Sequence, residues 1–126
     1  TPNRIEAEIL TGKSIGSISE AREVARQIQD LGVTSVIIKG GHLPGDQVVD
    51  ILFDGKNFYE FQGPRLNNRN THGTGCTFGA AVAASLALGH SLVDATKAAK
   101  MYVEESIRHS VPIGHGRGPL NHFWNK

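Results

Sequence analysis

The segment His72-Gly73-Thr74-Gly75-Cys76 combines residue types from which an anion site can be built. Gly73 and Gly75 allow backbone torsions that other residues resist, and free N–H groups at the start of a helix attract a phosphate or a developing oxyanion. Glycines also precede helices for purely steric reasons, so the pattern alone leaves both interpretations open. It lacks the lysine and the spacing of a Walker A loop, and it does not match the dinucleotide-binding fingerprint.

Cys76 is the single cysteine of the chain. We expect it in the first turn of a helix, where the helix dipole favours the reactive thiolate. The alternative is a buried structural cysteine, which the sequence around Cys76 does not exclude by itself.

Lys39-Gly40-Gly41-His42 follows a run of β-branched residues that predicts a buried strand. The carboxyl ends of strands in open α/β sheets are where ligands bind, and a lysine there can serve as a point charge for phosphate. A solvated lysine at the end of a strand is an equally common explanation for Lys39.

Asn3 and Glu6 form an N-x-x-E element at the start of a predicted helix. An amide and a carboxylate three residues apart can share one face of a helix and hold a hydrated Mg²⁺ through water. The alternative is a helix cap, in which Asn3 caps the helix and Glu6 completes a capping box.

Other chemistries find little support in the sequence. The six histidines include no pair at i,i+4, and the lone cysteine forms no C-x-x-C pair, which argues against a transition-metal site. No serine stands in a G-x-S-x-G elbow. Thirteen Lys and Arg are interspersed with twelve Asp and Glu, so we expect no nucleic-acid partner and no membrane partner.

The elements that must position these residues alternate between helix and strand. Ser17-x-x-Glu20 is a capping-box pattern, and Gly32 is a C-cap signal. Between them the apolar residues have helical spacing, and we expect them to face the core: Ile18, Ala21, Val24, Ala25, Ile28 and Leu31. Residues 35–39 predict a strand that is covered on both faces of a mostly parallel sheet.

The middle of the chain predicts an antiparallel hairpin. Residues 48–53 and 57–61 are strand-like and flank Asp54-Gly55, a dipeptide suited to a tight turn. Residues 63–70 are expected to form a polar loop.

Two more helices and an irregular tail complete the prediction. The apolar run from about Cys76 to Leu88, closed by Gly89, predicts a helix buried inside a soluble protein rather than a membrane span. Ser91 and Asp94 start another helix, in which seven residues are expected to face inward: Leu92, Ala95, Ala98, Ala99, Tyr102, Val103 and Ile107. The Gly-rich tail from Val111 predicts no regular structure.

The length of 126 residues fits one domain. A single cysteine indicates a reducing compartment, and we expect a cytoplasmic protein. The chain begins at Thr1 without a methionine and with a helical pattern close behind, which indicates a piece of something longer.

Four segments together carry a family resemblance. They are TPNRIEAE, VIIKGGH, NTHGTGCTFGAAVAASLALG and GHGRGPLNHFW. In order and spacing they resemble the hydroxymethylpyrimidine/phosphomethylpyrimidine kinases of thiamine biosynthesis, members of the ribokinase-like superfamily, over the C-terminal half of those enzymes. Most relatives in the superfamily carry Asp where Cys76 stands. The resemblance implies an α/β fold: the C-terminal half of a three-layer α/β/α structure, with part of a mostly parallel sheet and an antiparallel hairpin.

The resemblance also implies roles for individual residues. Gly73, Thr74 and Gly75 match the anion hole, and Cys76 matches the catalytic base. Lys39, Asn3, Glu6 and Thr71 match residues that bind the cofactor, with Glu6 contacting Mg²⁺ through water. The cofactors it implies are ATP and Mg²⁺, and the hairpin and the helix after Cys76 would bound the adenine site.

Residues 1–126 would then be the ATP-binding and catalytic segment of a kinase whose N-terminal, substrate-binding half is absent. The implied substrate is a small pyrimidine. A strand at residues 36–39 would have an unpaired edge and an uncovered apolar face, which predicts a homo-oligomer or pairing with the missing half. Two alternatives remain: a pyridoxal-type vitamin kinase, against which Cys76 argues, and a noncatalytic fragment that binds a nucleotide or a partner protein.

Overall fold

The computed structural model describes residues 1–42 and 45–126, without the side chain of His42. The chain divides into two compact units, Thr1–Arg65 and Leu66–Lys126.

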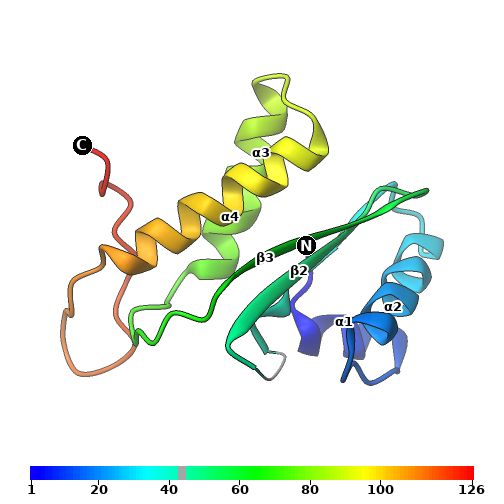
Figure 1. Ribbon diagram of the computed structural model, residues 1–126, viewed down its shortest axis with the longest axis horizontal. Helices are drawn as coiled ribbons and strands as arrows, with labels where there is room; N and C mark the ends of the chain where they lie inside the picture. Colours follow the sequence, from blue (N-terminus) through cyan, green and yellow to red (C-terminus); the bar gives the residue numbers. More distant parts are fainter. Residues whose placement is uncertain (43–44) are drawn as a thin grey trace. The chain divides into compact units, whose positions relative to one another are not determined.

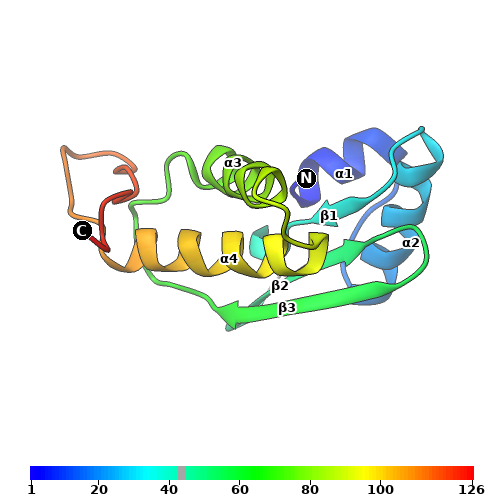
Figure 2. The same cartoon turned by 90° about the horizontal axis from the view of Figure 1, so that it is seen from above.

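The first unit combines helices with a small sheet (Figures 1 and 2). Its elements are α1 (Arg4–Thr11), α2 (Ile18–Asp30), β1 (Val36–Ile38), the short 3₁₀ helix η1 (Gly40–His42), β2 (Gln47–Phe53) and β3 (Phe58–Pro64). This mixture of helix and strand confirms the predicted α/β class.

The sheet has the order β1-β2-β3, and both pairs of strands are antiparallel. The expected mostly parallel sheet is therefore not found among the described residues, where parallel pairing in this unit is limited to a bridge between Asn3 and Lys39. The reason is the connection from Ile38 to Gln47, which is too short for the crossover of a dozen or more residues that parallel strands need. All three residues of β1 are buried, so the predicted uncovered face of this strand is not seen.

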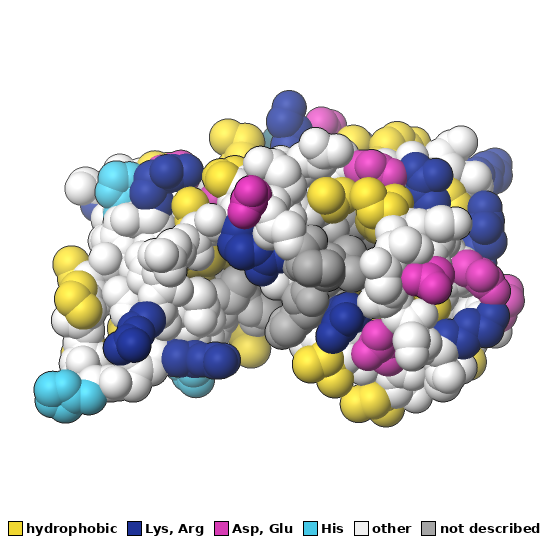
Figure 3. All heavy atoms as spheres, turned by 60° about the horizontal axis from the view of Figure 1, so that its bottom comes forward, with side chains coloured by type: hydrophobic (Ala, Val, Ile, Leu, Met, Phe, Trp, Pro, Cys, Tyr) yellow, Lys and Arg dark blue, Asp and Glu magenta, His cyan; other side chains and the backbone are white. Residues whose placement is uncertain are grey.

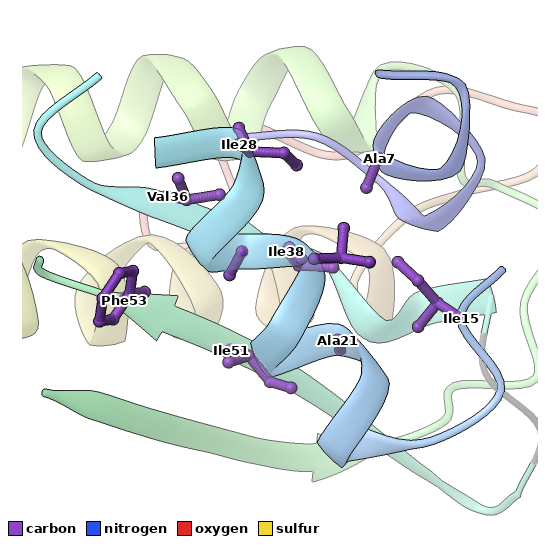
Figure 4. Close-up of a cluster of buried hydrophobic side chains, with 10 residues drawn as sticks. Ala7, Ile15, Ala21, Ile28, Val36, Ile38, Ile51 and Phe53 are labelled. Atoms are coloured by element: carbon purple, nitrogen blue, oxygen red, sulfur yellow. The ribbon is translucent and has the colours of Figure 1, made fainter. Parts of the chain in front are cut away.

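Helix α2 packs its apolar side on the sheet. Ser17 caps the helix by accepting a hydrogen bond from the Glu20 N–H at 3.2 Å. Figure 4 shows the resulting cluster. Its members are Ala7, Ile15, Ala21, Val24, Ala25, Ile28, Val36, Ile38, Ile51 and Phe53. Burying a large aliphatic side chain contributes about 1.5–3 kcal/mol, so this cluster dominates the stability of the unit.

Leu31 is an exception to the predicted apolar face of α2. It was expected to face inward, but its exposed fraction is 65%. The helix ends at Asp30, and Gly32 then adopts a φ of 110°, which turns the chain away from the helical path. A residue at the C-cap no longer follows the helical period.

The predicted hairpin is confirmed. Asp54 Oδ1 accepts the N–H groups of Asn57 at 2.7 Å and Lys56 at 2.8 Å. These two hydrogen bonds, the one from Asn57 first, lower the pKa of Asp54 below its ordinary value. The rings of Phe53 and Phe58 stack across the strands with centroids 4.4 Å apart. β3 continues to Pro64, so the polar loop begins later than residue 63.

The second unit pairs two helices, α3 (Thr74–Ala87) and α4 (Leu92–Arg108), which lie side by side in Figures 1 and 2. α3 begins two residues before the predicted start, and Gly89 ends it with a φ of 87°. Ser91 caps α4 by accepting a hydrogen bond from the Asp94 N–H at 3.1 Å. The tail from Val111 contains no helix or strand beyond a single bridge, as predicted.

Burial in the two helices differs partly from the prediction. α3 was expected to be buried, but within it only Phe78 and Val82 are buried, and Leu86 is exposed. On α4 the predicted inward residues Ala95, Ala99, Val103 and Ile107 are buried, whereas Ala98 is exposed. Two antiparallel helices cover only one stripe of each other, so the remaining faces stay open.

The surface carries charges of both signs. Figure 3 shows one face, on which Lys and Arg side chains are interspersed with Asp and Glu toward the right of the view. Among the helices that the structure describes, none has both the length and the apolar composition to cross a membrane.

Candidate functional site

The anion turn, defined as residues 71–76, comprises the residues just before α3 and the first three residues of that helix. Gly73 is the N-cap of the helix and has a φ of 86°, in the left-handed region that favours glycine. No side-chain hydrogen bond caps α3, in contrast to α1, α2 and α4. The first N–H groups of a helix have no partner within it, and an anion is a suitable acceptor for them.

Hydrogen bonds hold the anion turn in a compact shape. The Thr74 hydroxyl donates to the carbonyl oxygen of Thr71 at 2.7 Å, and the Thr74 N–H reaches the same carbonyl at 3.3 Å. The Thr77 N–H donates to the carbonyl of Gly73 at 2.9 Å. These hydrogen bonds fix the backbone at the start of α3, and the role of the turn as an anion hole stays a prediction.

Cys76 is the third residue of α3, and its side chain is exposed. This position confirms the prediction of a cysteine in the first turn and contradicts the alternative of a buried structural cysteine. The thiol borders an open groove of about 730 Å³ between α3 and α4, which Ala80, Ala84, Ala98 and Tyr102 also line. A reactant can thus reach the sulfur from this side of the unit.

Three further residues, which the sequence did not mark as functional, support the anion turn: Asn68, Asn70 and Gly118. The Asn70 N–H donates to Asn68 Oδ1 at 2.8 Å, and Asn68 Nδ2 donates to the carbonyl of Ile107 at 2.8 Å. The His72 N–H donates to the carbonyl of Gly118 at 3.1 Å. The polar stretch of residues 67–70 was the only signal for the asparagines, because such residues favour turns stabilised by side-chain hydrogen bonds.

The Lys39 turn, defined as residues 39–41, is held by the neighbouring strand β2. The Gly40 N–H donates to Oδ1 of Asp50 at 2.8 Å, and Asp50 is buried. A Cβ atom on Gly40 would lie 1.8 Å from the carbonyl oxygen of Val49, so the turn rests directly on the backbone of the strand. Arg65 adds a hydrogen bond from Nη1 to the carbonyl of Gly41 at 2.8 Å.

Lys39 lies next to Asn3 in the first unit. The two residues form a parallel bridge, and the Lys39 N–H donates to the carbonyl of Pro2 at 3.0 Å. Asn3 and Lys39 are therefore neighbours in the fold, and their role in cofactor binding stays a prediction.

Asn3 and Glu6 form the capping box that was the alternative to a Mg²⁺ element. Asn3 Oδ1 accepts the Glu6 N–H at 3.0 Å, and Glu6 Oε2 accepts the Asn3 N–H at 2.7 Å. The cap does not use the full capacity of the carboxylate, since two oxygens offer about four lone pairs and Glu6 is exposed. Among residues 1–42 and 45–126, no three His, Cys, Asp or Glu side chains cluster as a metal site.

The predicted site residues thus form two groups, one on each unit. Asn3, Glu6 and Lys39 belong to the first unit, and residues 71–76 belong to the second. Within each unit the geometry is suited to anionic oxygens: a lysine beside a helix cap in one, and an uncapped helix start in the other.

The chain is similar in structure to pyridoxal kinases and to a phosphomethylpyrimidine kinase. Pyridoxal kinase of Staphylococcus aureus superposes with a TM-score of 0.92 at 36% identity, over 98% of this chain and 46% of that one. Phosphomethylpyrimidine kinase of Clostridium difficile gives a TM-score of 0.69 at 35% identity, over 84% of this chain and 41% of that one. The chain therefore has part of the fold of the ribokinase-like kinases.

Sequence comparison narrows this class to one family. The family model for phosphomethylpyrimidine kinase matches residues 1–121. The chain is 46% identical over 124 residues to the hydroxymethylpyrimidine/phosphomethylpyrimidine kinase of Bacillus subtilis, covering 98% of this chain and 46% of that protein. It is 50% identical over 123 residues to a thiamine biosynthesis bifunctional protein of Geobacter sulfurreducens, covering 98% of this chain and 25% of that protein.

The chain belongs to the phosphomethylpyrimidine kinase family, which confirms the resemblance seen in the sequence. It spans less than half the length of the relatives just described.

Proposed function

We propose that this chain is the C-terminal, ATP-binding and catalytic segment of a kinase of thiamine diphosphate biosynthesis. The complete enzyme phosphorylates 4-amino-5-hydroxymethyl-2-methylpyrimidine and then phosphorylates the resulting monophosphate. The observation that carries this proposal is the uncapped start of α3, with an exposed Cys76 in its first turn, in a chain of this family.

The anion turn stabilises the phosphoryl group during its transfer. Phosphoryl transfer depends mainly on positioning and on the stabilisation of charge at the oxygens of the transferring group. The N–H groups of Gly75 and Cys76 belong to the first turn of α3, which needs no reorganisation to offer them. Gly73 supports them by its left-handed conformation, and Thr74 by its hydrogen bond to Thr71.

Cys76 is the general base of the first step. Its thiolate accepts the proton of the pyrimidine hydroxymethyl group while the alcohol oxygen forms the new bond to phosphorus and ADP leaves. In the second step the acceptor is a phosphate that is already ionised, so the transfer hardly needs a base. The two steps should therefore depend on Cys76 to different degrees.

Lys39 and Thr71 are the side chains proposed to contact the nucleotide. Lys39 provides a positive point charge, and Thr71 of the anion turn is a further cofactor-binding residue. Relatives with this fold have been solved with AMP-PCP and with ADP, which supports the use of ATP. Glu6 fits a Mg²⁺ held through water, because Mg²⁺ keeps several waters and takes one or two carboxylates; when bound, the ion neutralises phosphate charge.

The pyrimidine-binding residues would lie in the half of the enzyme that this chain does not span. β1 lies at the edge of the described sheet, which supports pairing of this chain with that half or with a second copy. A cytoplasmic location remains a prediction from the single cysteine.

Pyridoxal phosphorylation is a second candidate, because pyridoxal kinase structures match this fold with TM-scores of 0.92 and 0.93. A two-substrate assay of a full-length enzyme carrying this chain separates the candidates. We expect kcat/KM for the hydroxymethylpyrimidine to exceed that for pyridoxal by at least about tenfold, a difference of about 1.4 kcal/mol in transition-state binding. The reverse preference would make the enzyme a pyridoxal kinase.

A further inference from the structure

We infer that the Gly-rich tail positions the anion turn, and that Gly118 and Asn70 form the contact through which it acts. This role rests on the proposed function, because the turn matters for catalysis only if it binds the transferring phosphoryl group. Residues 111–118 form an exposed loop except for Gly118, which is buried.

The chain after Gly118 is anchored to α4. Leu120 is buried, and the Asn121 N–H donates to the carbonyl of Ser106 at 3.0 Å. The Tyr102 hydroxyl donates to the carbonyl of His122 at 3.0 Å. Because α4 is a helix of four to five turns, this anchoring gives the tail a fixed frame.

Gly118 connects the anchored part of the tail to the anion turn. Its carbonyl accepts the His72 N–H at 3.1 Å, and Pro119 forms a parallel bridge with His72. A Cβ atom on Gly118 would lie 2.1 Å from Oδ1 and 2.8 Å from Cγ of Asn70. The absence of a side chain at position 118 is therefore what lets the tail approach the turn so closely.

Asn70 cannot easily move out of the way. Its exposed fraction is 6%, and its N–H is bound to Asn68. Asn68 is itself fixed by hydrogen bonds to the carbonyl of Ile107 at 2.8 Å and to the Ser110 hydroxyl at 3.1 Å. Because the Asn70 side chain is buried, a side chain at position 118 would push it against its neighbours, and the anion turn that follows Asn70 would shift.

A displacement at His72 would move the N–H groups at the start of α3 and the thiol of Cys76, because they lie only a few residues away. His72 precedes Gly73, the N-cap of α3, and Cys76 is three residues further on. An error of about 1 Å in the placement of a catalytic group can lower a rate by about 10²-fold. Gly118 and Asn70 are thus positioning residues that act through the N–H groups and the thiol of the anion turn.

The test uses four variants of a full-length enzyme carrying this chain: Gly118→Ala, Asn70→Ala, the double variant, and Gly116→Ala as the matched control. A Cβ atom on Gly116 would meet no atom within 4 Å. The first measurement is the rate constant for alkylation of Cys76 by iodoacetamide, followed by mass spectrometry of the peptide that contains it. The second is kcat and KM for the hydroxymethylpyrimidine.

We expect Gly118→Ala to change the alkylation rate by at least about threefold and to lower kcat by about 10-fold to 100-fold, with KM for the pyrimidine within about twofold. Gly116→Ala should match the unaltered enzyme. In the Asn70→Ala background, adding Gly118→Ala should change either rate by less than about twofold, because the clash is gone.

Two results would overturn the inference. In the first, Gly118→Ala and Gly116→Ala have the same alkylation rate and the same kcat. In the second, adding Gly118→Ala lowers these rates as much in the Asn70→Ala background as in the unaltered enzyme. If Gly118→Ala does not fold, recovery of folding in the double variant supports the contact and its failure overturns it. If the unaltered enzyme phosphorylates neither the hydroxymethylpyrimidine nor its monophosphate, the proposed function fails. The alkylation rates still decide whether Gly118 positions the turn.

Discussion

The Lys39 turn and the anion turn are both glycine-rich, but they are held in different ways. The Lys39 turn rests on one strand, with Asp50 bound to the Gly40 N–H and the backbone of Val49 directly beneath. The anion turn is held by irregular segments, Asn68 and Asn70 on one side and Gly118 on the other. The Lys39 turn is therefore tied to a strand of the sheet, whereas the anion turn depends on segments outside any sheet.

Gly40→Ala should produce the largest effect on stability. A Cβ atom there would lie 2.6 Å from the carbonyl carbon of Val49 as well as 1.8 Å from its oxygen, so either the turn or β2 must shift. Overpacking of this kind costs about 3 kcal/mol. The free energy of unfolding, measured by urea denaturation, should fall by that amount.

Gly41→Ala is the matched control, because a Cβ atom on Gly41 would meet no atom within 4 Å. We expect it to change the free energy of unfolding by less than about 0.5 kcal/mol. If the two variants unfold alike, β2 does not support the Lys39 turn and the contrast between the two turns disappears.

Asp54→Asn should produce the smallest effect. The hydrogen bonds from Asn57 and Lys56 lower the pKa of Asp54, so its stabilising contribution is present above the unfolded value of about 3.9 and is lost as the pH falls through the folded value. Asparagine can still accept both N–H groups, so stability near pH 7 should fall only slightly.

The acid dependence of unfolding checks this expectation. Below about pH 4, the urea midpoint of the unaltered protein should fall more steeply than that of Asp54→Asn. If the urea midpoints of both proteins fall equally with pH, the ionised carboxyl of Asp54 does not stabilise the turn that joins β2 and β3.

Local sequence signals predicted much of the fold. Ser17 and Ser91 cap their helices as expected, and Asp54-Gly55 forms the hairpin turn. The position of Cys76 in the first turn of α3 also followed from the sequence, because Gly73 and Gly75 mark the start of the helix. These features are decided by interactions within a few residues.

Features that depend on distant residues were not predicted. The antiparallel partner of β1 and the burial of Asp50 under Gly40 require the folded sheet. The contact between Asn70 and Gly118 joins residues far apart in the chain, and no local pattern marks either of them as its partner. For Asn3 and Glu6 the sequence left two interpretations open; the capping box is observed, and the role in Mg²⁺ binding remains a prediction.

We propose that Cys76 in the anion turn is the base for phosphoryl transfer to an alcohol. The most direct test compares Cys76→Ala with the unaltered full-length enzyme in both phosphorylation steps. We expect kcat for the hydroxymethylpyrimidine to fall by about 10²-fold, as for loss of a general base, and kcat for the second phosphorylation to fall much less. Unchanged turnover of the alcohol, or an equal loss in both steps, would contradict it.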